Sequence, residues 1–178
     1  SICRIVSPTL IETKDSVRIE TDRGFYNTNT EQSILLDRSL ITHPDGTMTG
    51  DSILYDKKRQ ISQAYYDVVI DNQEDKVTYF GDYGYMDEAN GYVYATGRAY
   101  VMDYSEKDTL YMSAEIMEGI KRNLPPSPGT TDSLEVKYTK GYHDVRLYRR
   151  DIQAIGDSIH YFSVDSLIKL FGSPILWN

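Results

Sequence analysis

Apolar and polar residues alternate in many short stretches of the chain, a pattern typical of β-strands that bury one face. The clearest stretches are Val17–Glu20, Tyr66–Ile70, Gly97–Met102 and Asp144–Leu147. Polar segments separate the stretches, and those with Pro-Asp-Gly at 44–46 or Asn-Gly at 90–91 carry strong turn signals. The pattern predicts at least ten antiparallel strands and almost no helix.

Only the segment Ser163–Phe171 is a candidate helix. It is rich in residues that favour strands, and Gly172-Ser173-Pro174 ends it. We therefore expect strand–turn–strand here, with the turn at Val164–Ser166.

A motif of a small residue, an acidic residue and then strand-forming residues occurs five times. Its acidic residues are Asp22, Asp51, Asp82, Glu115 and Asp157, at intervals of 29, 31, 33 and 42 residues. Gly50–Tyr55 and Gly156–Tyr161 agree at five of six positions, which predicts equivalent places in successive layers of a stack. The longest interval contains three prolines, so residues 121–133 are predicted to be an inserted loop.

Strands with one apolar side must stack to bury that side. We therefore expect an all-β fold: an elongated folded-over sheet, an open jelly roll or a β-solenoid, with a continuous interior trough. One domain is expected over residues 1–178, with unpaired strand edges at both ends. The chain starts without Met and stops on the strand-like Ile175–Asn178, which suggests a trimmed fragment of a longer protein.

Composition narrows the class of function. The chain has 16 Tyr but only 4 Phe and 1 Trp, which suits strands with one wet face. Its net charge of −8 disfavours nucleic-acid binding, because an acidic surface repels phosphates. Cys3 is the only cysteine, so no disulfide can form within the chain. Cys3 is read either as an inert thiol or as a lipid-attachment site.

No catalytic residue, metal site or cofactor is predicted, and the chain is not expected to be an enzyme. The three histidines, His43, His143 and His160, lack the spacing of zinc ligands, and no nucleotide or nucleophile motif occurs. The repeated acidic residues offer carboxylates for glycoside hydrolysis, but their regular period favours a structural ladder. Tyrosine also suits carbohydrate stacking, although half-exposed strand positions explain its abundance more simply.

The order of the motifs resembles the OstA/LptA-type organic-solvent-tolerance domain, particularly the OstA-like proteins of Bacteroidetes. The matching segments are Gly50–Tyr55, Ala95–Val101, Asp108–Glu115 and Val145–Trp177, and the resemblance extends from about residue 15 onward. The resemblance implies an elongated folded-over antiparallel β-jelly-roll, also called a β-taco, in which an apolar trough shields lipopolysaccharide acyl chains. The resemblance also implies that the protein lies in the periplasm and is either free or associated with the outer membrane. The implied partners are lipopolysaccharide or another acylated lipid, and related β-jelly-roll modules joined edge to edge.

Alternation selects the side chains that face the trough, because one parity of each strand points inward. The predicted lipid-binding residues are Ile53, Tyr55, Tyr66, Val68, Ile70, Ala99, Val101, Val145 and Leu147.

Two other functions stay open: a non-catalytic structural β-scaffold or cell-envelope adhesion domain, and a carbohydrate-active enzyme. The interior distinguishes the three. An open apolar groove favours the lipid carrier, a filled core favours the scaffold, and a polar cleft with two close carboxylates favours the enzyme.

Overall fold

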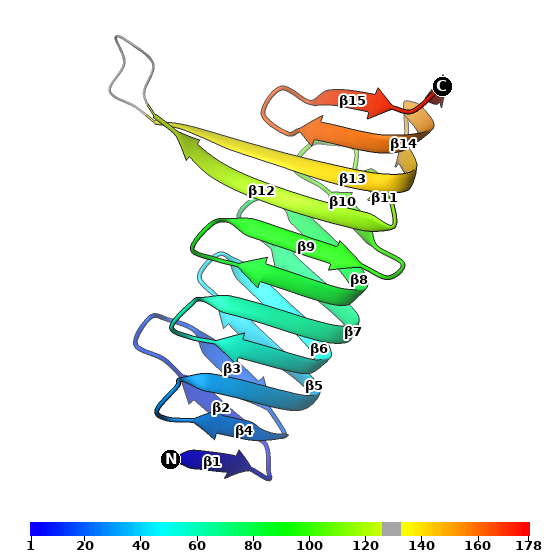
Figure 1. Ribbon diagram of the computed structural model, residues 1–178. Helices are drawn as coiled ribbons and strands as arrows, with labels where there is room; N and C mark the ends of the chain where they lie inside the picture. Colours follow the sequence, from blue (N-terminus) through cyan, green and yellow to red (C-terminus); the bar gives the residue numbers. More distant parts are fainter. Residues whose placement is uncertain (126–132) are drawn as a thin grey trace.

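The computed structural model describes residues 1–125 and 133–178, and these form one antiparallel sheet that is folded over on itself (Figure 1). Its sixteen strands are β1 (Ile2–Ile5), β2 (Thr9–Glu12), β3 (Arg18–Thr21), β4 (Arg23–Asn27), β5 (Gln32–His43), β6 (Gly46–Asp56), β7 (Ile61–Asn72), β8 (Val77–Asp87), β9 (Tyr92–Thr96), β10 (Tyr100–Asp103), β11 (Leu110–Ser113), β12 (Ile116–Leu124), β13 (Leu134–Arg149), β14 (Ile152–Phe162), β15 (Leu167–Phe171) and β16 (Ile175–Trp177). The described residues contain no helix. The predicted all-β folded-over sheet is confirmed.

The fold has two layers that meet at a corner. The strands β5, β6, β7, β8, β13 and β14 each run through both layers, and register shifts mark where they cross. Layer A comprises β2, β3, β10, β11, β16 and the parts of the long strands at 39–43, 46–50, 68–72, 77–81, 145–149 and 152–156. Layer B comprises β1, β4, β9, β12, β15 and the parts at 32–36, 52–56, 61–65, 83–87, 134–142 and 158–162. The edge opposite the corner, where the hairpin turns of the two layers face each other, is the mouth.

Two kinds of residue pair alternate along the corner. One kind has both residues in the left-handed region, with φ between +45° and +75°: Asp37-Arg38, Tyr66-Asp67, Gly97-Arg98, His143-Asp144 and Gly172-Ser173. The other kind is the small–acidic pair of the sequence repeat, for example Gly50-Asp51 opposite Asp37-Arg38. Each repeat therefore covers two passages of the chain around the corner.

The two most similar copies of the repeat occupy equivalent places. Gly50 and Gly156 each lie beside a register shift, and the five residues after each glycine start exposed and then alternate. Asp51 and Asp157 both point outward at the corner, while Ile53 and Ile159 are buried.

Of the predicted turn and the predicted loop, the structure confirms the turn and corrects the start of the loop. The turn at Val164–Ser166 lies between β14 and β15, as predicted. The predicted loop at 121–133 is wrong at its start, because Lys121–Leu124 continue β12 and pair with β13. Pairing with β13, from Lys121 opposite Lys137 to Leu124 opposite Leu134, extends the strand up to the prolines. Residues 126–132 lie outside the described residues.

Glycine lets the two layers approach closely. A Cβ on Gly84 of layer B would lie 2.6 Å from Cγ1 of Val68 in layer A. A Cβ on Gly119 would collide with the Tyr79 hydroxyl from the opposite layer. Side chains from one layer therefore pack directly on the backbone of the other.

The left-handed corner makes a testable prediction about Tyr66. Its φ of +61° is unfavourable for a residue with a Cβ, and its side chain is exposed. We expect Tyr66→Gly to raise the free energy of unfolding by about 1 kcal/mol, because glycine adopts this conformation without strain. The measurement is urea denaturation. Tyr65→Gly is the matched control and should be destabilising, because Tyr65 has an ordinary strand conformation and its ring lies 5.2 Å from that of Tyr83.

Candidate functional site

Eight of the nine predicted lipid-facing residues lie between the two layers, each at most 3% exposed. They are Ile53, Tyr55, Val68, Ile70, Ala99, Val101, Val145 and Leu147. All eight belong to one apolar cluster that runs through the stack. The parity assigned to them from the sequence is correct, and their contact with lipid stays a prediction.

The inward orientation predicted for Tyr66 is wrong. Tyr66 is 67% exposed, because it and Asp67 form one of the left-handed corner pairs. Between the pairs Tyr65–Tyr83 and Val68–Gly81, strand β7 has two residues, whereas β8 has only Asp82. The backbone therefore turns at Tyr66, and its side chain points away from the interior.

The interior is filled with side chains. Wholly buried residues come from both layers, with Ile41, Met48 and Met112 in layer A and Met117 and Ile159 in layer B. The trough expected from the sequence is thus present as two facing apolar surfaces, but these surfaces are packed together rather than open.

A pocket of about 140 Å³ lies at the mouth, between the turns of the two layers. Its apolar lining includes Ile70 and Val77 from layer A and Met86 and Val93 from layer B. Tyr79 lies among them, and its hydroxyl is 3.4 Å from the Thr139 hydroxyl across the interior. Burial raises the pKa of Tyr79 to about 12, so the phenol is neutral. An apolar ligand that enters between the layers would meet this pocket first.

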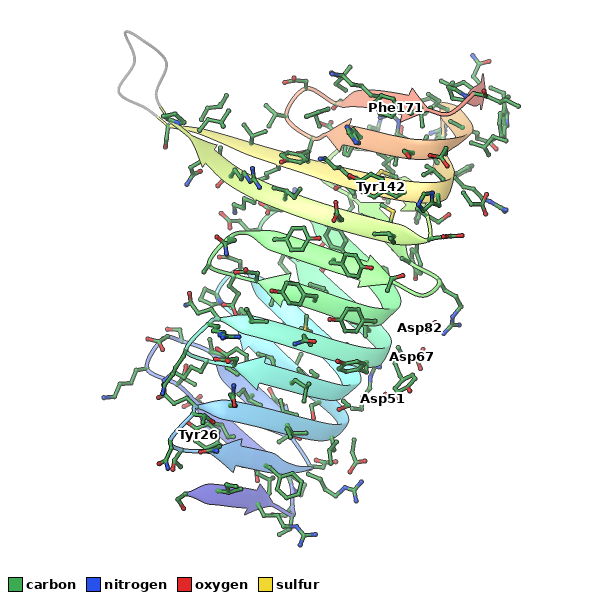
Figure 2. The ribbon with its side chains drawn as sticks, viewed as in Figure 1. Tyr26, Asp51, Asp67, Asp82, Tyr142 and Phe171 are labelled. Atoms are coloured by element: carbon green, nitrogen blue, oxygen red, sulfur yellow. The ribbon has the colours of Figure 1, made fainter. Side chains whose placement is uncertain are left out.

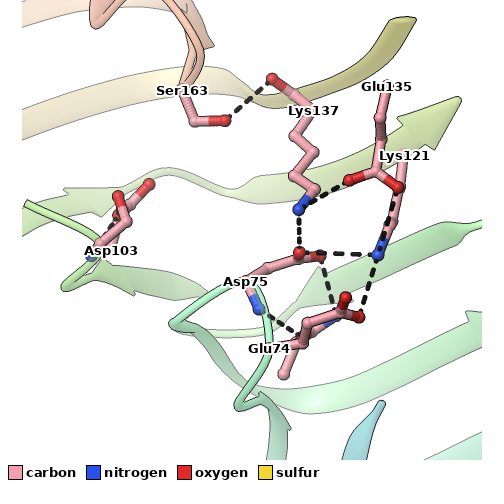
Figure 3. A network of polar contacts seen from close by, with 9 residues as sticks. Glu74, Asp75, Asp103, Lys121, Glu135, Lys137 and Ser163 are labelled. Atoms are coloured by element: carbon pink, nitrogen blue, oxygen red, sulfur yellow. Dashed lines mark hydrogen bonds and ion pairs between the residues drawn. The ribbon is translucent and has the colours of Figure 1, made fainter. Parts of the chain in front are cut away.

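Charged side chains bridge the mouth beside the pocket (Figure 3). Asp75, in the β7–β8 turn of layer A, contacts Lys137 and lies 3.6 Å from Nζ of Lys121, both in layer B. Glu74 lies 3.3 Å from Lys121, and Glu135 lies 2.8 Å from Lys137. These five residues, the mouth network, hold the turn of one layer to two strands of the other.

A second polar contact spans the mouth between other turns. Nδ1 of His43, at the end of β5 in layer A, lies 2.9 Å from Oε1 of Glu88 in layer B. The His43 side chain is only 4% exposed, and its ring meets that of Tyr55 edge to face at 6.0 Å. His43 thus belongs to the closure of the mouth.

The mouth network has a predicted pH dependence. Burial alone lowers the pKa of Lys121 and Lys137, but the neighbouring carboxylates, above all Asp75, outweigh it and raise both pKa values. The hydrogen bond from Lys137 lowers the pKa of Glu135. The stability that Glu135 contributes is lost as pH falls through its lowered pKa. The stability that the two lysines contribute is lost as pH rises through their raised pKa values.

We therefore expect the network to stabilise the fold most between about pH 5 and pH 10. The test compares the free energy of unfolding of the wild type and Lys137→Met across pH. The difference should be largest near neutrality and should shrink in acid. Lys107→Met, at an exposed lysine between β10 and β11, is the control and should show no such profile.

The acidic residues of the repeat lie outside, along the corner, where Figure 2 labels Asp51 and Asp82. Asp51 lies 3.6 Å from Arg38, and Asp82 accepts a hydrogen bond of 3.1 Å from Nε of Arg98, which lowers its pKa. Asp51 and Asp82 are thus both matched by a basic neighbour on an exposed edge. This arrangement fits the structural ladder expected from the sequence better than a pair of carboxylates for glycoside hydrolysis.

Residues 1–125 and 133–178 contain no group of three His, Cys, Asp or Glu side chains placed to hold a metal ion. They also contain no helix with the length and apolarity to cross a membrane.

The sequence matches no family model and no curated protein. Among solved structures, the fold is similar to the crystal structure of LptH from Pseudomonas aeruginosa, described as the LptA homologous periplasmic component of the conserved lipopolysaccharide transport device. The TM-score is 0.54 with 14% sequence identity, over 71% of this chain and 81% of LptH. The chain has an LptA-like β-jelly-roll fold. The likeness expected from the order of the sequence motifs is therefore confirmed at the level of the fold.

The contacts at the mouth were not predicted from the sequence. Nothing in the sequence pairs His43 with Glu88, or Asp75 with Lys137. The available signal was the position of these residues in or beside polar turns, which all gather at one edge once the sheet folds over.

Proposed function

We propose that this chain is a non-catalytic module of lipopolysaccharide transport that binds acyl chains between its two layers. The observation that carries the proposal is the continuous apolar cluster between the layers of an LptA-like fold. LptH is described as a periplasmic transport component, and the proposal places this chain in the same compartment, either free or associated with the outer membrane. The narrower assignment to the OstA-like proteins of Bacteroidetes belongs to the proposal as well.

Binding would require the layers to separate at the mouth. A dry cavity of about 150 Å³ holds one benzene, so a pocket of about 140 Å³ is too small for an acyl chain. Removing each CH₂ from water gains about 0.8 kcal/mol. Partly exposed ion pairs contribute only about 0–1 kcal/mol each, so several methylenes outweigh the ion pairs at the mouth, and an acyl chain would replace the apolar contacts that are lost when the layers part.

Neighbouring residues of β7 provide the test. A lipid A analogue with a photoreactive group at the end of one acyl chain is bound, irradiated and mapped by mass spectrometry. We expect labelling at the inward-facing Ile70 and not at Val69, which faces outward. Labelling confined to the outer face, or no saturable labelling that unlabelled lipopolysaccharide competes away, would contradict the proposal.

The packed interior favours a second candidate, a structural scaffold that holds no ligand. A scaffold predicts no labelling at Ile70 under any loading condition, including mild warming that loosens the layers. The same experiment therefore separates the two functions.

Edge-to-edge assembly is part of the proposal. The strands β1, β2, β15 and β16 each pair on one side only, so their backbone groups on the other side are open to another module. We expect concentration-dependent association in analytical ultracentrifugation. Ile2→Lys together with Leu10→Lys should weaken it by placing charge along the β1–β2 end, where both residues are exposed.

The control for this prediction is Val6→Lys, at an exposed residue in the connection between β1 and β2. It adds charge without altering a paired strand and should leave association unchanged. Monomeric behaviour of the wild type at high concentration would contradict the prediction.

A further inference from the structure

A groove of about 490 Å³ lies on the outer face of layer A, on the opposite side of the sheet from the apolar interior. Its aromatic lining comes from four strands: Tyr100 on β10, Tyr111 on β11, Tyr148 on β13 and Trp177 on β16. Each of these side chains is between 39% and 52% exposed. The volume falls within the range of about 300–1,000 Å³ that is usual for small-molecule sites.

Strand register sets the spacing of the rings. Tyr111 and Tyr148 are directly opposite each other, with ring centroids 6.2 Å apart. Tyr148 pairs with Gln153 on β14, and Gln153 pairs with Trp177 on β16. The amide of Gln153 therefore lies between two aromatic side chains, with each strand about 4.8 Å from the next.

Polar groups complete the lining. Ser113, on β11, is directly opposite Arg146 on β13, and both line the groove with Asp144. The Arg146 guanidinium lies 3.5 Å from the Asp144 carboxylate, so the two charges balance. The Gln153 amide and the Ser113 hydroxyl also line the groove, and both groups can donate and accept hydrogen bonds.

This combination of groups has no role in the core. The rings are on the solvent side of the sheet, and four partly exposed aromatic side chains gathered in one hollow mark a binding surface. A charge-balanced groove offers little attraction to phosphate or to a cation. Its donors and acceptors lie beside flat apolar rings, which suits a ligand with many hydroxyl groups and an apolar ring face.

We propose that this groove binds a neutral saccharide. The C–H face of a sugar ring stacks on Tyr111, Tyr148 or Trp177, and its hydroxyl groups hydrogen-bond with Gln153, Ser113 and the Asp144–Arg146 pair. The site goes beyond the proposed lipid function, because it lies outside the interior and needs no separation of the layers.

Trp177 is the only tryptophan of the chain, so its fluorescence reports directly on the groove. The wild type is titrated with tetrasaccharides of glucose and of N-acetylglucosamine, and with the polysaccharide released from lipopolysaccharide. We expect a saturable change in fluorescence with at least one of them. Binding of the released polysaccharide alone identifies the sugars of the proposed cargo, whereas binding of the tetrasaccharides identifies a general glycan site.

Tyr111→Ala keeps the fluorescent reporter and should weaken binding about tenfold, because a stacking partner is lost. Tyr66→Ala removes an exposed tyrosine at the corner, outside the groove, and should leave the affinity unchanged. Absence of any saturable change at millimolar saccharide overturns the proposal. So does a fluorescence change that depends only on protein concentration, which would mean that a second copy of the chain covers the groove. The proposed lipid function is unaffected by either result, since its test reads labelling at Ile70.

Discussion

Val68→Asp is expected to abolish most of the stability of the fold. Val68 is 2% exposed and packs across the interior on Gly84 of the opposite layer. A carboxylate at this place has no basic partner and no water, and an unpaired buried charge costs about 3–5 kcal/mol. Domains are stable by only about 5–15 kcal/mol in total, so the variant should unfold at low urea or fail to fold.

Val69→Asp is the matched control, since Val69 is the next residue of β7 and lies on the outer face opposite Thr49 and Phe80. It should lose much less stability in the same urea titration. In acid the introduced carboxyl is protonated, so the loss in free energy of unfolding caused by Val68→Asp should become smaller. Equal effects of the two substitutions at neutral pH would contradict the packed interior. Because a charge at Val68 disrupts folding, this variant tests the packing of the interior. Lipid binding is better mapped by photolabelling.

The sequence predicted the strands because their alternation is local. In a strand, residues two positions apart lie on the same face. In Ser52–Tyr55 and Asp144–Leu147 the buried residues are accordingly Ile53, Tyr55, Val145 and Leu147. The repeat also predicted a stack, because similar motifs at intervals of 29, 31 and 33 residues require similar surroundings in successive layers. These features depend only on neighbouring residues and on the burial of one strand face.

The corner was not predictable from the same rule. Alternation assumes an uninterrupted strand, and β7 contains a left-handed pair at Tyr66-Asp67 without a glycine to signal it. Gly97 and Gly172 do supply such a signal at two other corners. The remaining corner pairs contain Asp or His, which tolerate positive φ more readily than most residues. From Asp37 the corner pairs follow at intervals of 29, 31, 46 and 29 residues, so a period of about 30 residues places all of them except His143-Asp144 relative to the preceding pair.

The contacts at the mouth could not be predicted from the sequence for a different reason. Its contacts join turns from different hairpins, such as the β7–β8 turn with β12 and β13. Their partners are set by how far the sheet folds over, and no local pattern encodes that angle. The same holds for the outer groove, whose rings come from four strands between Tyr100 and Trp177.

Cross-linking the mouth is expected to block acyl-chain loading, if loading occurs by separation of the layers. Asp45 and Ala89 are exposed, lie in facing turns of layer A and layer B, and line the same depression at the mouth. In a Cys3→Ser background, Asp45→Cys and Ala89→Cys would be joined by a short bifunctional maleimide. The closed form should load a fluorescent lipid A analogue about tenfold more slowly or not at all, because the layers can no longer part at this point.

The same double variant treated with a monofunctional maleimide carries equal modification without the bridge and should load like the wild type. Lys137→Met should shift loading in the opposite direction, because it removes the ammonium that holds Asp75 and Glu135 to the mouth network. The cross-linked form must also unfold at a urea concentration no lower than the singly modified one, which excludes damage to the fold. Equal loading rates for bridged and unbridged protein would mean that acyl chains do not enter between these turns. They would then have to enter from an end of the stack, where the described strands β1 and β15 each pair on one side only.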